Sequence, residues 1–94
     1  LMRSLALEFA RTGLTVNAIC PSFVDTPMVD DSAARIARAT GKSVEEARAI
    51  LARTNGNGRL ITVAEVTHAI MQLCHPDASG VNGACVTIDG GTSA

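Results

Sequence analysis

The stretch GLTVNAICPSFVDTPM, residues 13–28, decides how this chain folds. Gly13 follows a run over residues 1–12 in which apolar side chains recur at helical spacing, so it is placed to end a helix. Residues 15–20 carry no charge and, apart from Asn17, are β-branched or apolar, which is typical of a strand covered on both faces. A helix, a glycine and a buried strand in this order form the second half of a β-α-β unit. The sequence therefore predicts an α/β fold with parallel strands.

The remainder of the chain continues this alternation. Prolines interrupt the segment 21–28, which we expect to be a loop. Helical periodicity and two capping boxes, Ser43 with Glu46 and Thr62 with Glu65, predict helices. The expected helices cover residues 31–39, 43–54 and 62–75, and a second strand covers 84–88. The sum is two parallel strands and about four helices; an antiparallel pair would instead indicate an unrelated small helical domain.

Composition excludes several classes of function. The 94 residues allow one domain, and a net charge of −1 with a pI near 6.1 gives no reason to expect nucleic acid or an anionic membrane as partner. No apolar run reaches the roughly 18 residues that a membrane span needs. The three cysteines, Cys20, Cys74 and Cys85, each lie in an apolar run. We therefore expect reduced, buried thiols in a cytoplasmic protein.

Four segments follow one another in the order and spacing of a known family. They are LMRSLALEF (1–9), GLTVNAICPSFVDTPM (13–28), NGNGRLITVAEV (55–66) and VNGACVTIDGG (81–91). They resemble four parts of the short-chain dehydrogenases/reductases: the second half of the helix after the Tyr-x-x-x-Lys motif, the sixth strand with its Pro-Gly-x-x-x-Thr loop, the Gly-Arg turn, and the closing strand. The resemblance implies that residues 1–94 are the C-terminal part of a single dinucleotide-binding oxidoreductase domain with a doubly wound, Rossmann-like parallel sheet.

The resemblance also implies an activity for the whole enzyme. It is hydride transfer between a secondary alcohol and a ketone with NAD or NADP, and the stretch 15–29 with the following helices resembles members that act on 3-oxoacyl or 3-hydroxyacyl compounds. The chain contains no Tyr, so the family's proton donor is missing from it. We expect the catalytic Ser, Tyr and Lys upstream, no catalytic residue in the chain, and no activity from the 94 residues alone. The alternative is a non-catalytic oligomerisation or binding module derived from this fold.

Ligands of open parallel sheets bind at the carboxyl ends of the strands, which is where the loop 21–28 lies. By resemblance, Pro21 and Ser22 pack beside the nicotinamide ring, Val24 offers its backbone to the carboxamide, and Thr26 bonds the carboxamide or the diphosphate.

Thr26 has a second interpretation, and Ser22 departs from the family pattern. Thr26 precedes Pro27, which suits the first position of a helix, so Thr26 is also a candidate N-cap. Ser22 stands where the family pattern has glycine, which permits close approach of the backbone.

Residues 29–54 are expected to form a lid over a small carbonyl or alcohol substrate. Met28, Val29, Ile36 and Ile50 either line its apolar pocket or pack between helices. The resemblance further implies a homo-oligomer, a tetramer or a dimer.

Other polar residues are given structural roles. We expect Asn17 to bond a neighbouring loop and Asp89 to cap a turn. The segment 56–58 follows a helix and lacks a third glycine, so it is not a phosphate loop. His68 and His75 are seven residues apart rather than four, so no metal site is expected.

Overall fold

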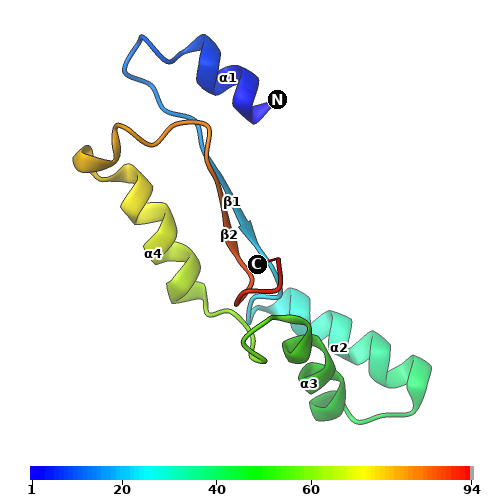
Figure 1. The fold of residues 1–94 in the computed structure, drawn as a ribbon. Coiled ribbons are helices and arrows are strands. Elements are labelled where there is room, and N and C mark those ends of the chain that lie inside the picture. The colour runs from blue at the N-terminus through cyan, green and yellow to red at the C-terminus, as the bar shows by residue number, and fades with distance from the viewer. Residues whose placement is uncertain (94) are drawn as a thin grey trace.

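The structure is a computed structural model that describes residues 1–93 of the chain. These residues form two parallel strands and four α-helices, which confirms the predicted fold class (Figure 1). In chain order the elements are α1 (Met2–Glu8), β1 (Ala18–Pro21), α2 (Pro27–Thr40), α3 (Val44–Thr54), α4 (Val63–Cys74), the 3-10 helix η1 (Pro76–Ala78) and β2 (Cys85–Ile88).

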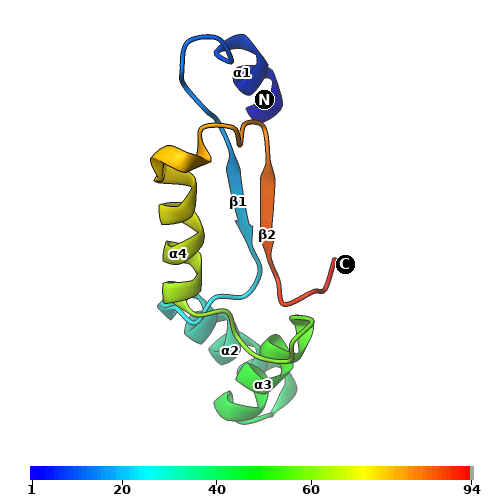
Figure 2. The same cartoon turned by 60° about the vertical axis from the view of Figure 1, so that its left-hand side comes forward.

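The sheet consists of β1 and β2, paired in parallel from Ala18 with Cys85 to Pro21 with Ile88. One more hydrogen bond extends the pairing beyond β1, since the Ser22 amide donates to the Ile88 carbonyl at 2.9 Å. The helix α4 runs beside β1 and belongs to the crossover that makes a parallel pair possible (Figure 2). The parallel direction rules out the unrelated helical domain.

The helices α2 and α3 form an antiparallel hairpin beyond the carboxyl ends of the strands, while α1 lies at the opposite end (Figure 1). The hairpin contains a cluster of buried side chains, which are Val29, Ala33, Ala47 and Leu51. By contrast, α4 buries none of its residues completely. The described chain is accordingly elongated, with extents of 55 × 24 × 23 Å.

Several element boundaries differ from the prediction. The helix α2 begins at Pro27, four residues before the expected start at 31, because a proline with its fixed φ fits the first turn of a helix. The strand β1 begins at Ala18 rather than 15. The Val16 backbone instead pairs with a turn, accepting from the Gly83 amide at 2.8 Å. The helix α1 ends at Glu8, short of the predicted 12.

The expected burial of the cysteines is wrong within the described chain, although all three are free thiols. Cys20 and Cys85 project from adjacent strands with their Sγ atoms 2.8 Å apart. Ile19 faces α4, and successive side chains of a strand point to opposite faces, so Cys20 lies on the face that α4 leaves open. The apolar character of residues 15–20 predicted a covered strand but did not show which element covers each of its faces.

The structural roles assigned to two polar residues are confirmed. The Asn17 side chain donates to the Val81 carbonyl at 3.1 Å and accepts from the Ala84 amide at 2.9 Å, which fixes the start of β1 against the turn before β2. Asp89 closes the turn after β2, since its carboxylate accepts from the hydroxyl and amide of Ser93 and from the Gly91 amide. The Ser93 hydroxyl bond and these amides hold the pKa of Asp89 below its usual range.

Candidate cofactor site

The segment that follows β1 continues in an extended path along the residue that precedes α4. The Ile61 amide donates to the Phe23 carbonyl at 2.9 Å, and the Asp25 amide donates to the Ile61 carbonyl at 2.8 Å. These bonds form a parallel bridge between Val24 and Ile61, and the Ile61 side chain is buried. The segment therefore lies at the carboxyl end of β1 in a defined conformation, as the sequence predicts.

A buried side chain fixes this arrangement from the end of α3. Asn55 is 1% exposed, and its amide nitrogen donates to the Phe23 carbonyl at 3.1 Å and to the Arg59 carbonyl at 2.8 Å. The next residue, Gly56, donates its amide to the Asp89 carbonyl at 2.9 Å. The loops that follow β1, α3 and β2 therefore meet at one edge of the sheet.

A cavity of about 460 Å³ opens at this edge. All four residues predicted for the cofactor site line it: Pro21, Ser22, Val24 and Thr26. Its remaining lining residues come from the same segment, from the start of α2 and from the first turns of α4; they are Phe23, Met28, Val29, Ser32, Val63, Val66 and Thr67. None of these side chains is charged, so the cavity suits a neutral, largely apolar group.

The candidate lid residues divide between the two interpretations offered for them. Met28 and Val29 line the cavity, and Val29 also belongs to the buried cluster between α2 and α3. Ile36 packs against that cluster instead. Ile50 is half-buried and does not line the cavity. Sequence reasoning missed Val63 and Val66, since a capping box locates the start of α4 but not the neighbour of its first turn.

Thr26 occupies the N-cap position of α2, yet its side chain makes no capping bond. Its hydroxyl donates to the Val24 carbonyl at 3.3 Å. The matching residue of α4, Thr62, does cap its helix, because its hydroxyl accepts from the Glu65 amide at 3.1 Å. The Thr26 hydroxyl is thus half-buried at the cavity without a role in holding the helix.

The backbone beside Thr26 also has hydrogen-bonding capacity to spare. Within residues 1–93, the Val24 amide donates to no group, and the Val24 carbonyl accepts only the Thr26 hydroxyl. Ser22 has no positive φ, a conformation that only glycines adopt in the described chain. Serine in place of the family's glycine therefore causes no backbone strain here.

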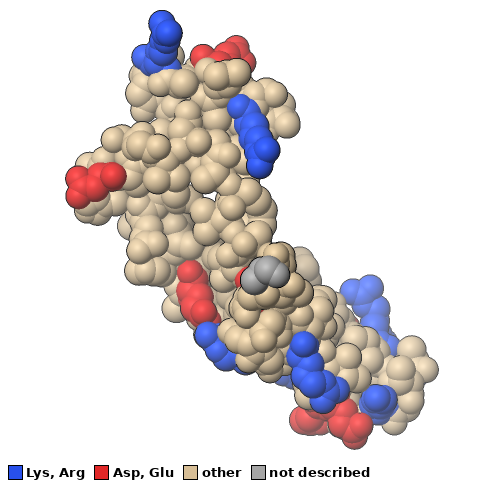
Figure 3. Space-filling view, viewed as in Figure 1, with Lys and Arg blue, Asp and Glu red and all other residues tan. Residues whose placement is uncertain are grey.

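A charged cluster lies outside the cavity, and sequence reasoning did not find it. Arg48 of α3 forms ion pairs with Asp25, at 3.0 Å, and with Asp30 in the first turn of α2. The Asp25 hydrogen bond contributes most to raising the pKa of Arg48. Spacing could not reveal the cluster, because 23 residues separate Arg48 from Asp25. Elsewhere on the face shown in Figure 3, basic and acidic side chains are interspersed rather than gathered into one patch.

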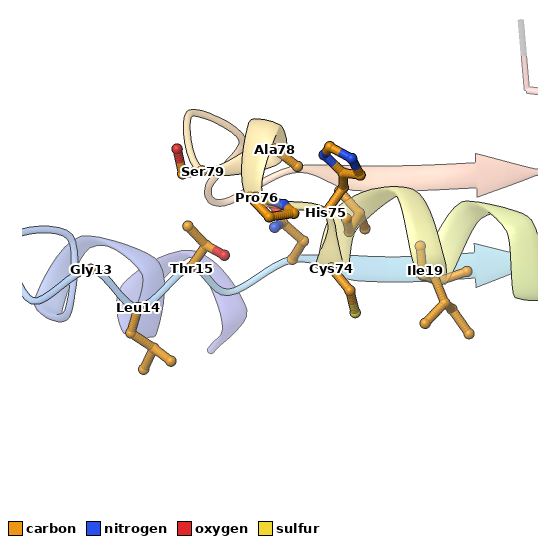
Figure 4. A pocket seen from close by; sticks show the side chains of 12 residues that line it. Gly13, Leu14, Thr15, Ile19, Cys74, His75, Pro76, Ala78 and Ser79 are labelled. Atoms are coloured by element: carbon orange, nitrogen blue, oxygen red, sulfur yellow. The ribbon is translucent and has the colours of Figure 1, made fainter.

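Another cavity, of about 570 Å³, lies at the opposite end of β1 (Figure 4). It is lined by the segment before β1 and by the end of α4, including Cys74 and His75. Residues 1–93 contain no cluster of three or more His, Cys, Asp or Glu side chains able to hold a metal ion. Among the helices of these residues, none has the length and hydropathy to cross a bilayer.

Comparisons with known proteins agree with this geometry. A family profile described as Enoyl-(Acyl carrier protein) reductase matches residues 1–93. A short-chain dehydrogenase of Pyricularia oryzae is 39% identical over 93 residues, which make up 99% of this chain and 31% of that protein. A D-beta-hydroxybutyrate dehydrogenase of Rhizobium meliloti is 35% identical over 95 residues, covering 100% of this chain and 37% of that protein.

A crystal structure of an actinorhodin polyketide ketoreductase variant with NADPH superposes with a TM-score of 0.87 at 34% identity, covering 97% of this chain and 35% of that one. The chain thus spans about a third of the length of these relatives. Because the profile extends over residues 1–93 and the fold superposes over almost the same span, the chain belongs to the short-chain dehydrogenase/reductase family.

Proposed function

We propose that this chain forms part of an NAD- or NADP-dependent oxidoreductase that interconverts a secondary alcohol and a ketone. The observation that carries the proposal is the cavity at the carboxyl end of β1. It brings together Pro21, Ser22, Val24 and Thr26, and within residues 1–93 the Val24 amide beside it has no hydrogen-bond acceptor. Nicotinamide supplies the hydride acceptor or donor of such a reaction when it is bound.

The residues present fit the nicotinamide end of that cofactor. A carboxamide offers two donor hydrogens and one acceptor oxygen, so it needs both kinds of partner. Within residues 1–93 the Val24 amide is a free donor, and the Val24 carbonyl has a lone pair to share beyond its bond to Thr26. The uncharged lining formed by Pro21 and Val66 suits the planar ring.

Each part of the chain has a separate task in this proposal. Val24 and Thr26 orient the carboxamide, which fixes the rotation of the ring and hence the face presented to the substrate. Pro21 and Ser22 limit the space beside the ring. The hairpin of α2 and α3, which contains the proposed lid 29–54, shields the reacting centre from water. No residue of this chain moves the proton, because the chain contains no Tyr and its Lys42 lies between α2 and α3.

The proposed substrates are 3-oxoacyl or 3-hydroxyacyl compounds. Support comes from the names of two similar proteins, a D-beta-hydroxybutyrate dehydrogenase and a putative ketoacyl reductase of Streptomyces coelicolor that is 36% identical over 89 residues. An exposed Met28 at the mouth of the cavity adds an apolar, adaptable contact for an acyl chain. We further propose that the whole enzyme is a homo-oligomer and that the 94 residues alone catalyse nothing.

The test uses the whole protein that contains this chain. Purified protein is titrated with NADH and with NADPH, following the fluorescence of the reduced nicotinamide, and is then assayed with 3-oxoacyl thioesters and with ketones that have no acyl group. We expect saturable binding of at least one nucleotide and reduction of an oxoacyl substrate. Absence of binding by either nucleotide would refute the cofactor site, whereas binding with reduction of other ketones only would refute the substrate class.

A further inference from the structure

Arg48 of α3 connects that helix to two parts of the structure that border the cavity, the segment after β1 and the start of α2. It lies in the second turn of α3, and its two terminal nitrogens bond different carboxylates. Nη2 donates to Asp25 at 3.0 Å, in the segment after β1, and Nη1 donates to Asp30, in the first turn of α2. The planar guanidinium suits this role because it directs several donors along fixed directions, which a lysine ammonium cannot do.

Asp25 is thereby held from two sides. Its amide donates to the Ile61 carbonyl at 2.8 Å, and its carboxylate accepts from Arg48. The residues on either side of it are Val24 and Thr26, the proposed partners of the carboxamide. Any movement of the Asp25 backbone therefore moves both of these groups.

The packing of α2 against α3 determines where the Arg48 side chain begins. Ala33 and Ala47 are fully buried at the contact between α2 and α3, and their small side chains allow the helices to approach closely. Arg48 follows Ala47 directly, so its stem begins at that contact and its side chain is only 32% exposed. The buried contact thus fixes the point from which the Arg48 side chain extends, and the two ion pairs hold its guanidinium.

We infer that Arg48 is a positioning residue for cofactor binding: it keeps the Val24–Thr26 backbone and the α2–α3 hairpin in the one relative arrangement that accepts the nicotinamide. The inference rests on the proposed function. When only a fraction of the protein molecules are in the conformation that binds a ligand, the apparent affinity for that ligand is reduced by this fraction. Loss of Arg48 therefore lowers affinity for the cofactor while the chemical step of the saturated enzyme stays almost unchanged.

The experiment compares variants of the whole enzyme. Arg48→Gln removes the charge, and Arg53→Gln is the matched control, since Arg53 lies on the same helix, is exposed and has no ion pair within residues 1–93. For Arg48→Gln we expect the KM and Kd of the cofactor to rise roughly fivefold or more, the lower end of typical coupling between sites. We expect kcat to change by less than about twofold, and Arg53→Gln to match the unmodified enzyme.

A second variant separates positioning from folding. Asp25→Asn keeps the shape of the side chain and removes only its charge. It therefore tests the positioning role of Arg48 even if Arg48→Gln does not fold. We expect it to raise the cofactor KM by less than Arg48→Gln does, because the pair between Arg48 and Asp30 remains. The double variant should be no worse than Arg48→Gln alone, because Arg48→Gln already removes the contact with Asp25. Arg48→Lys, with one ammonium for two carboxylates, should recover only part of the affinity.

Distinct outcomes overturn the two claims. If the unmodified enzyme binds the nucleotide and both Arg48→Gln and Asp25→Asn have the cofactor KM of Arg53→Gln, Arg48 has no positioning role and the proposed function stands. A fall in kcat with an unchanged KM also contradicts the inference. If the unmodified enzyme binds neither NADH nor NADPH, the proposed function is wrong and the inference falls with it.

Discussion

The side-chain amide of Asn55 donates to the backbone carbonyl of Phe23 at 3.1 Å, across 32 residues of sequence. The same nitrogen donates to the Arg59 carbonyl, so one buried group connects the segment after β1 to the turn after α3. The opposite orientation of the amide would aim its oxygen at two carbonyl oxygens. The observed orientation therefore leaves Oδ1 without a hydrogen-bond partner within residues 1–93.

Substitution of Asn55 should destabilise the whole enzyme. Asn55→Ala leaves two carbonyls without this donor in a buried site, which costs about 1–3 kcal/mol. Asn55→Asp should be worse at neutral pH, because a carboxylate has no hydrogen to donate and faces two carbonyl oxygens. Urea unfolding measures both, with the exposed Asn57→Ala as control. Equal midpoints for Asn55→Ala and Asn57→Ala would contradict this role of Asn55.

Thr26 and Thr62 offer a matched pair, since both occupy N-cap positions and only Thr62 caps its helix through its side chain. Thr62→Ala should cost about 1 kcal/mol of stability and leave the cofactor KM unchanged. Thr26→Ala should show the reverse, a raised KM for the nicotinamide nucleotide with stability lowered by less than about 0.5 kcal/mol. Thermal melts and initial rates provide the two readouts. A Thr26→Ala variant with unaltered KM would remove this hydroxyl from the site.

The sequence predicted what local chemistry determines. Pro21 ends β1, the capping box of Thr62 begins α4, and Asp89 closes a turn, all as expected. It also placed residues 21–28 at the carboxyl end of β1, where the cavity opens, because the carboxyl end of a parallel strand is set by chain direction alone.

What the sequence left unresolved depends on distant contacts. Nothing in the spacing links Arg48 to Asp25, or Asn55 to Phe23, since tertiary packing brings each pair together. The burial of Cys20 was mispredicted for the same reason: an apolar strand signals two covered faces, and the described chain covers only one. For the start of α2 the sequence supports two interpretations of Pro27, as an interruption of regular structure or as the first residue of a helix, and the structure shows the second.

Glu65 should make stability depend on acid pH. The Arg59 guanidinium, with hydrogen bonds from Thr62, lowers the pKa of Glu65 to about 2, from an ordinary value of 4.5. A carboxyl with a lowered folded-state pKa stabilises the protein fully above its unfolded pKa, and the contribution is lost as pH falls from 4.5 toward about 2. Glu65→Gln should therefore melt lower than the unmodified enzyme at neutral pH, and the difference should shrink in acid.

The control for this titration is Glu45→Gln, at the start of α3, where Glu45 has no ion pair within residues 1–93. Melting temperatures recorded from neutral pH down to the acid limit of folding give the comparison. A difference between Glu65→Gln and the unmodified enzyme that stays constant over this range would show that the Arg59 contact does not shift the titration of Glu65.

Gly56 packs closely against the turn that follows β2. A Cβ on this residue would lie 2.5 Å from the Gly90 carbonyl oxygen and 2.6 Å from the Thr92 amide nitrogen. Both are backbone atoms, so Gly56→Ala must displace the turn that closes β2, and forcing extra atoms into such a contact costs about 1–3 kcal/mol. Gly80→Ala is the control, since a Cβ there meets nothing within 4 Å. We expect urea unfolding to show a loss for Gly56→Ala and none for Gly80→Ala. Equal free energies of unfolding for the two variants would mean that the turn after β2 shifts at no cost. The close packing at Gly56 would then not stabilise this edge of the sheet.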